Sequence, residues 1–161
     1  FMYLVAQYKK PKVVVELGVR GGKGLVHLHL GHPDAQLISV DIDYRNLHPQ
    51  VRGICKNTHY LEGVTVAKID EVAAICDQYG KIDVIFFDSD HEYEYLKEEF
   101  ELYDPLCEDG CIQMFDDLNW GAGNQSGVWK FWQEDQGGIK FGLTGLHGFL
   151  ETEDFGIRIK T

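Results

Sequence analysis

The stretch KVVVELGVRGG, residues 12–22, decides the fold class. Residues 12–17 form a nearly continuous apolar run, which is typical of a strand buried on both faces of a sheet. The glycine-rich segment 18–24 follows at once, and Gly18 allows a tight turn and the close approach of a ligand to the backbone. Residues 25–30 then have the pattern of a short helix. The unit is therefore a strand, a glycine-rich turn and a helix. Three glycines in five positions favour a ligand-binding turn, and the alternative is a plain turn between strand and helix.

The rest of the chain repeats this alternation. Each predicted strand is an apolar run that precedes a turn, and each predicted helix has apolar residues at three- and four-residue spacing. We predict further strands at 37–40, 64–67, 82–87 and 111–115, helices at 49–57, 71–79, 93–103 and 128–136, and two strands within 139–160. This order predicts an α/β fold, Rossmann-like and doubly wound. Its mainly parallel sheet would have about seven strands and end in a C-terminal antiparallel hairpin.

Composition excludes several classes of partner. The 161 residues carry a formal net charge of −11, so a broad basic face for nucleic acid or an anionic membrane is not expected. No apolar stretch approaches the length needed to span a bilayer. The four cysteines lack a paired zinc-binding spacing, and we interpret them as buried thiols in a reducing compartment, which indicates the cytoplasm.

Acidic residues follow several of the predicted strands. Asp41 ends the second strand, Asp88 and Asp90 follow the fourth, and Asp116 and Asp117 follow the fifth. Neighbouring parallel strands lie about 4.8 Å apart, so these carboxylates would crowd together and repel one another. A hard cation such as Mg²⁺ would relieve that repulsion and would lower the pKa of a bound substrate hydroxyl. The alternative is a set of solvated loop acids.

Two side chains in this group are candidates for the proton transfer. Asp90 or His91 could take a proton from a substrate hydroxyl. The alternative for His91 is a hydrogen-bonded orienting role. Ser89 and Glu92 also fit a capping box at the start of the following helix, which would not compete with metal binding by the neighbouring acids.

The glycine-rich turn excludes two common nucleotide motifs. A dinucleotide fingerprint needs a second glycine where Arg20 stands, and no G-K-[ST] sequence follows to form a phosphate-binding Walker loop. Asp41 lies some 20 residues after the glycines, where an acid can accept hydrogen bonds from a ribose diol. The alternative for Asp41 is a helix N-cap or a solvated turn acid.

At this point the chain resembles the class I S-adenosylmethionine-dependent methyltransferases. ELGVRGG at 16–22 is similar to that family's E-x-G-x-x-x-G motif, and DID at 41–43 is similar to its ribose-binding acid. DSDHEY at 88–93 and FDD at 115–117 resemble the branch of macrolide-sugar O-methyltransferases and cephalosporin hydroxylase-like proteins. The resemblance implies a metal site formed by Asp88, Asp90, Asp116 and Asp117, and cofactor contacts from Glu16, Gly18, Arg20, Gly22, Asp41, Asp70 and Asp88, with Asp70 beside the adenine.

The resemblance also implies the activity. We expect the enzyme to transfer the methyl group of S-adenosylmethionine to a hydroxyl oxygen of a small molecule, assisted by Mg²⁺. We expect residues 1–161 to be one methyltransferase domain without the N-terminal cap helices that often cover the substrate in that family. Two alternatives stay open: a non-catalytic cofactor-binding module, and a nicotinamide-dependent oxidoreductase.

Two further segments carry predictions. The loop 118–127 could form a mobile lid in which Trp120 stacks on a substrate. Trp129, Phe131 and Trp132 make the next helix apolar almost all round. Core packing is the first interpretation of these rings, and a homo-oligomer interface is the alternative.

Overall fold

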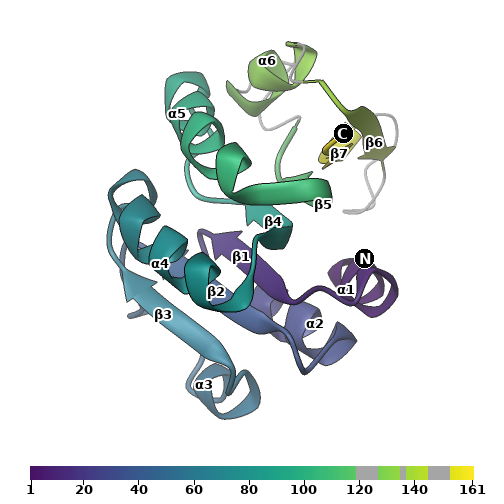
Figure 1. Cartoon of the computed structure of the whole chain (residues 1–161). Helices are drawn as coiled ribbons and strands as arrows, with labels where there is room; N and C mark the ends of the chain where they lie inside the picture. Colours follow the sequence, from purple (N-terminus) through teal and green to yellow (C-terminus); the bar gives the residue numbers. More distant parts are fainter. Residues whose placement is uncertain (119–126, 135–136, 145–152) are drawn as a thin grey trace.

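The computed structural model describes residues 1–118, 127–134, 137–144 and 153–161, which fold around one mixed sheet (Figure 1). The described residues form a seven-stranded sheet in the order β3-β2-β1-β4-β5-β7-β6. The strands are β1 (Val13–Leu17), β2 (Gln36–Asp41), β3 (Thr58–Glu62), β4 (Ile82–Phe87), β5 (Cys107–Phe115), β6 (Ile139–Thr144) and β7 (Glu153–Ile159). Strands β1 to β5 pair in parallel, and β7 pairs antiparallel with β5 and with β6. The predicted fold class is confirmed.

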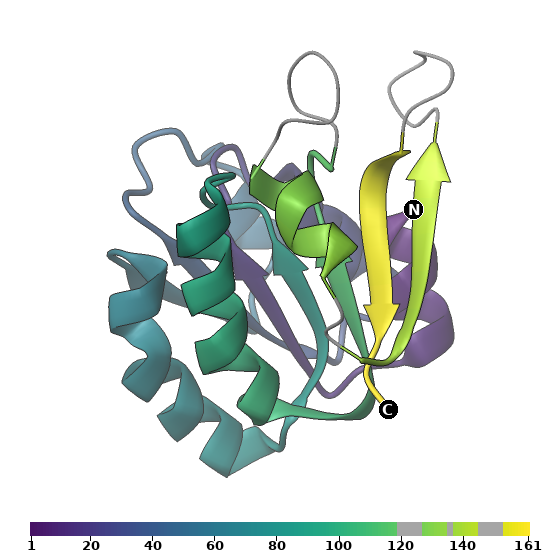
Figure 2. The same cartoon turned by 90° about the horizontal axis from the view of Figure 1, so that it is seen from above.

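Helices cover both faces of the sheet (Figures 1 and 2). One apolar core lies against the face that carries α4, α5 and α6, and a second core lies against the face that carries α1, α2 and α3. The helices are α1 (Met2–Lys9), α2 (Lys23–Gly31), α3 (Val51–Ile54), α4 (Ile69–Tyr79), α5 (Tyr93–Tyr103) and α6 (Gly127–Gln133), with the short 3₁₀ helices η1 (Thr65–Lys68) and η2 (Asp104–Leu106). Every residue of β1 and β4 is buried, as their unbroken apolar runs predicted.

The third predicted strand was placed wrongly. Residues 64–67 were expected to extend the sheet, but they lie at the helix η1 and the strand is Thr58–Glu62. β3 is an edge strand whose side chains are partly buried or exposed, so it lacks the apolar run that marks a central strand. This displacement of six residues has consequences for the site.

Other element bounds differ less. The helix predicted at 49–57 is only Val51–Ile54, and α1 was not predicted. β5 begins at Cys107 and passes through the expected turn at Gly110, whose φ of 80° accompanies a shift of register against β4. None of the described helices is long and apolar enough to cross a membrane.

Candidate active site

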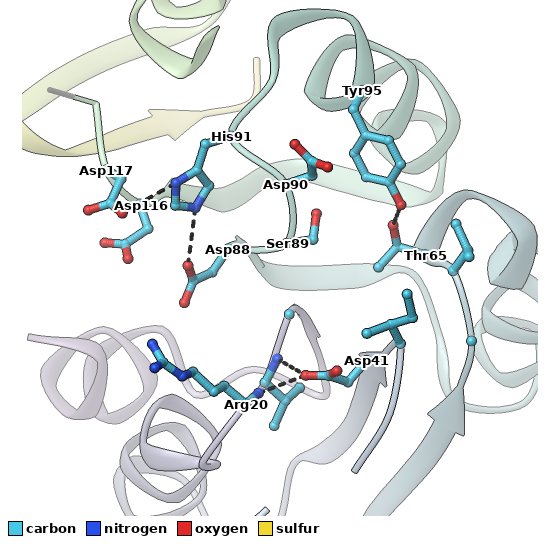
Figure 3. A pocket seen from close by; sticks show the side chains of 15 residues that line it. Arg20, Asp41, Thr65, Asp88, Ser89, Asp90, His91, Tyr95, Asp116 and Asp117 are labelled. Atoms are coloured by element: carbon cyan, nitrogen blue, oxygen red, sulfur yellow. Dashed lines mark hydrogen bonds and ion pairs between the residues drawn. The ribbon is translucent and has the colours of Figure 1, made fainter. Parts of the chain in front are cut away.

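A pocket of about 610 Å³ opens beyond the carboxyl ends of the parallel strands (Figure 3). The strand order reverses between β1 and β4, and ligands of open α/β sheets bind at this point. Eight of the predicted site residues line the pocket: Gly18, Arg20, Asp41, Asp88, Asp90, His91, Asp116 and Asp117. The structure does not bring Glu16, Gly22 or Asp70 to its lining.

Gly18 lets two strand ends meet at the base of the pocket. Its φ is 81°, and a Cβ atom there would lie 2.0 Å from the carbonyl oxygen of Asp88. No side chain fits such a gap, so only glycine allows the loop after β1 to touch the loop after β4. The backbone of Arg20 is also left-handed, with a φ of 47°, and its side chain extends along the pocket (Figure 3).

Asp41 holds the glycine-rich loop in place. Its Oδ2 accepts hydrogen bonds from the backbone N–H groups of Val19 and Arg20, each at 2.7 Å. Its Oδ1 accepts from the N–H of Asp43 at 3.1 Å. Three of the four lone-pair positions of the carboxylate are therefore used, and one remains for a ligand hydroxyl.

The opposite end of the pocket holds a cluster of acids around one imidazole. His91 lies between two carboxylates, with Nε2 3.6 Å from Asp88 Oδ1 and Nδ1 3.3 Å from Asp117 Oδ2. Hydrogen bonding to Asp88 raises the pKa of His91 above its ordinary value, and the charge of Asp117 adds to the effect, although burial of the ring opposes it. Burial and the nearby charge of Asp88 raise the pKa of Asp116 to about 6.

These acids offer a partial fit to a divalent cation. The described residues contain no group of three or more His, Cys, Asp or Glu side chains arranged to hold a metal ion. Burial, and after it the charge of Asp88, nevertheless raises the pKa of Asp116, so these two carboxylates lie close enough to interact. Two neighbouring carboxylates of this kind fit the preference of Mg²⁺ for hard oxygen ligands.

Asp90 and Ser89 have roles that differ from the predicted capping box. The N-cap residue of α5, Glu92, makes no side-chain capping bond, and Asp90 Oδ1 accepts the N–H of Glu92 at 2.9 Å. Ser89 Oγ instead donates to Glu99 Oε1 at 2.5 Å. The capping box was therefore wrong, because the serine hydroxyl turns toward a buried acid that is remote from the helix start.

Glu16 lies beneath the pocket floor, on the side of α2. Its side chain is buried against Gly24, and its Oε2 has no hydrogen-bond partner in the part of the chain that the structure describes. Burial, and then the charges of Asp88 and Asp41, raise its pKa well above the ordinary value. Gly22 is the N-cap of α2 and borders a separate hollow of about 280 Å³. Both residues shape the loop from behind.

Asp70 is exposed in the first turn of α4, away from the pocket. The prediction placed it after a strand at 64–67, whereas the true third strand ends at Glu62 and η1 begins at Thr65. Thr65, the first residue of η1, lines the pocket. The wrong position of the third strand therefore led the prediction to Asp70, and Thr65 was missed.

Sequence reasoning missed a group of hydroxyls on this side of the pocket. Thr65, Ser89 and Tyr95 line the pocket, and the first two donate hydrogen bonds to the fully buried Glu99. Glu99 lies on the apolar face of an otherwise acidic helix. A carboxylate at such a position is a usable signal, because buried acids are rare unless they are paired.

Two predictions about aromatic residues have different outcomes. Phe131 and Trp132 are buried, and Trp132 packs 5.8 Å from the ring of Phe115, so the core interpretation is confirmed for them. Trp129 packs against the same core. Trp120 and most of the predicted lid 118–127 lie outside the described residues.

Comparison with known proteins identifies relatives of the whole chain. The family that matches is Rhamnosyl O-methyltransferase/CmcI, over residues 3–137. A rhamnosyl O-methyltransferase of Mycobacterium leprae (strain TN) is 29% identical over 167 residues, covering 88% of this chain and 71% of the relative.

Solved structures share the fold. An O-methyltransferase from Bacillus cereus, in complex with S-adenosylhomocysteine (SAH), has a TM-score of 0.76 at 15% identity and covers 100% of this chain and 79% of its own. A TDP-rhamnose 3'-O-methyltransferase of calicheamicin biosynthesis has a TM-score of 0.72 at 19% identity, with coverage of 97% and 75%.

Proposed function

This chain belongs to the Rhamnosyl O-methyltransferase/CmcI family, and we propose that it methylates a hydroxyl oxygen of a sugar carried on a small molecule. The membership confirms the branch predicted from the motifs at 16–22, 88–93 and 115–117, and it makes the chain an S-adenosylmethionine-dependent methyltransferase. The family match does not favour the cofactor-binding module or the nicotinamide-dependent oxidoreductase. The observation that carries the proposal is the pocket at the strand-order reversal, with a tied glycine loop at one end and the acid cluster at the other.

The pocket lining supports one orientation of the cofactor. The free lone pair of Asp41 suits a ribose hydroxyl, and the apolar side chains of Ile42 and Val64 suit the flanks of an adenine. The loop of Gly18 and Arg20 then receives the methionine end. Arg20 and His91 are the basic residues among the described lining, and the Arg20 guanidinium makes no ion pair with any described side chain, so it suits the methionine carboxylate.

The chain's residues supply orientation and a base. S-adenosylmethionine supplies an activated methyl on a sulfonium, so the acceptor oxygen forms a bond to the methyl carbon as the bond to sulfur breaks. We assign His91 to take the hydroxyl proton, because Asp88 and Asp117 fix its ring at the pocket wall. Asp90 is the weaker candidate, since one of its oxygens already accepts the N–H of Glu92. Holding both reactants in line accounts for much of the rate.

Mg²⁺ would be held by Asp88 and Asp116, with Asp117 and Asp90 beside them in the lining. It would lower the pKa of a bound sugar hydroxyl. The raised pKa of Asp116 supports this assignment, because a cation would relieve the repulsion from Asp88.

Calorimetry and turnover test the proposal. We expect wild type to bind SAH and to release it from S-adenosylmethionine when a rhamnose-containing glycoside is supplied. An NADH titration is expected to show no binding. If the folded chain does not bind SAH at high micromolar concentration, the methyltransferase proposal is wrong. If it methylates catechols but no glycoside, the proposal of a sugar acceptor is wrong.

The metal has its own experiment. Mg²⁺ is titrated into wild type and into a chain with Asp116→Asn and Asp117→Asn together. We expect the double variant to lose affinity because two oxygen donors lose their charge. Equal affinities would remove the metal assignment and leave the methyl transfer proposal standing.

A further inference from the structure

A buried carboxyl group stands behind one wall of the pocket and takes no part in the proposed chemistry. Glu99 of α5 is 0% exposed. Its Oε1 accepts hydrogen bonds from the hydroxyls of Ser89 and Thr65, which both line the pocket, while its Oε2 has no partner among the described residues. One buried carboxyl oxygen therefore accepts the hydrogens of two hydroxyl groups in the pocket wall.

These bonds fix the direction of every hydroxyl hydrogen on that wall. A hydroxyl has one hydrogen to donate, and Ser89 and Thr65 both donate theirs to Glu99. Thr65 Oγ1 is 2.7 Å from the Tyr95 hydroxyl, so Tyr95 must be the donor in that pair. The three hydroxyl oxygens consequently present lone pairs to a ligand and no hydrogens. Burial raises the pKa of Glu99 to about 7, and its Oε1 can accept hydrogen bonds in either protonation state.

We propose that Glu99 is a positioning residue that makes this wall an acceptor-only surface and thereby selects the amino group of adenine in the cofactor. Such a surface attracts an N–H donor and repels the oxo group that hypoxanthine carries at the same ring position. The inference rests on the proposed function, because it takes S-adenosylmethionine as the ligand. Figure 3 places Thr65 and Tyr95 on the same side of the pocket as Asp41 and opposite Asp116 and Asp117, where the base would lie once the ribose meets Asp41.

The test compares two ligands that differ at this ring position. The dissociation constants of SAH and S-inosylhomocysteine are measured by calorimetry, and their ratio reports base selection. We expect wild type to bind SAH at least about tenfold more tightly, because the inosyl ligand sets an acceptor against acceptors. A purely structural role for Glu99 would weaken both ligands together and leave the ratio unchanged.

Three variants test whether Glu99 Oε1 is responsible for the ratio of the two dissociation constants. Glu99→Met removes the acceptor, so the hydroxyl hydrogens can turn toward the oxo ligand, and the ratio should fall toward one. Glu99→Gln keeps an acceptor oxygen and places its amide nitrogen where Oε2 has no partner, so the ratio should be retained. Tyr103→Phe is the matched control, because the Tyr103 hydroxyl donates to the carbonyl oxygen of Thr65 at 2.8 Å and does not touch its hydroxyl.

The outcomes separate the two levels of the proposal. If wild type binds neither ligand, the proposed function fails and this inference fails with it. If wild type binds both ligands equally, or if folded Glu99→Met keeps the wild-type ratio, only the role of Glu99 is overturned. Should Glu99→Met not fold, Thr65→Val removes one of the wall hydroxyls that Glu99 orients, and an unchanged ratio there overturns the role equally.

Discussion

The two ends of the pocket are built on opposite principles. At one end, the hydroxyls of Thr65 and Ser89 are tied to Glu99, and the loop of Val19 and Arg20 is tied to Asp41. At the other end, Asp88, Asp116, Asp117 and His91 crowd together, and the pKa values of Asp116 and His91 are raised. Under the proposed function, the protein alone would organise the cofactor end, whereas a cation and a substrate would complete the acid end.

The largest effect on stability and binding is expected from a substitution at Gly18, where the loops after β1 and β4 meet. Gly18→Ala would place a Cβ atom 2.0 Å from the Asp88 carbonyl oxygen at a φ of 81°, so the loops after β1 and β4 must separate. We expect a loss of about 4 kcal/mol or more in the free energy of unfolding, and loss of SAH binding. Denaturant unfolding and calorimetry measure both.

Gly21→Ala is the matched control in the same loop. A Cβ atom there meets nothing within 4 Å, so stability should change by less than about 1 kcal/mol. An equal loss of unfolding free energy in Gly18→Ala and Gly21→Ala would show that a side chain anywhere in this loop is destabilising, and that the contact between Gly18 and Asp88 is not the cause.

The next effect concerns the chemistry of the acid end. His91→Gln should lower methyl transfer by about 10²–10⁴-fold with little change in SAH affinity, because it removes the base and leaves the cofactor end intact. The neutral imidazole is the active form and its pKa is raised, so the wild-type rate should rise with pH through a value above 6.5. A pH–rate profile checks this, and a variant that keeps the same rising limb would exclude His91 as the base.

A smaller effect is expected on stability when Asp116 is removed from the acid cluster. The folded-state pKa of Asp116 is about 6 against an ordinary 3.8, so between these values the folded chain binds more protons and stability falls as pH rises. Asp116→Asn should remove part of that fall and stabilise the metal-free chain at pH 8 by about 1 kcal/mol.

Thermal unfolding from pH 4 to pH 8, with and without Mg²⁺, measures the effect. His91, whose raised pKa acts in the same direction, remains in the variant, so some slope should persist. Mg²⁺ should stabilise wild type more than Asp116→Asn at pH 8. An identical pH slope in the two chains would contradict the raised pKa of Asp116.

The smallest effect tests the cofactor end. Arg20→Gly relieves a left-handed backbone, so the free energy of unfolding should rise by about 0.5–1 kcal/mol. Loss of the guanidinium should weaken SAH binding by about threefold to tenfold.

Lys10→Gly is its control. Lys10 has a φ of 52° at the end of α1 and lies away from the pocket lining, so it should gain stability without losing affinity. Equal SAH affinity in wild type and Arg20→Gly would remove Arg20 from the carboxylate subsite.

The sequence by itself determined the features that depend on short-range patterns. Unbroken apolar runs marked β1 and β4 because both strands are buried on both faces. Asp41, Asp88 and Asp116 could be assigned to one pocket, since the carboxyl ends of parallel strands share one edge. The glycine and acid motifs were enough to indicate the family.

Only the tertiary structure decided which side chains turn toward the pocket. The edge strand β3 lacks an apolar run, so its position, and with it Thr65 in place of Asp70, came from its pairing with β2. Glu16 belongs to the motif yet lies buried beneath the loop, and Ser89 donates to Glu99 instead of capping α5. Side-chain direction depends on contacts between segments far apart in the chain, and no local pattern records those contacts.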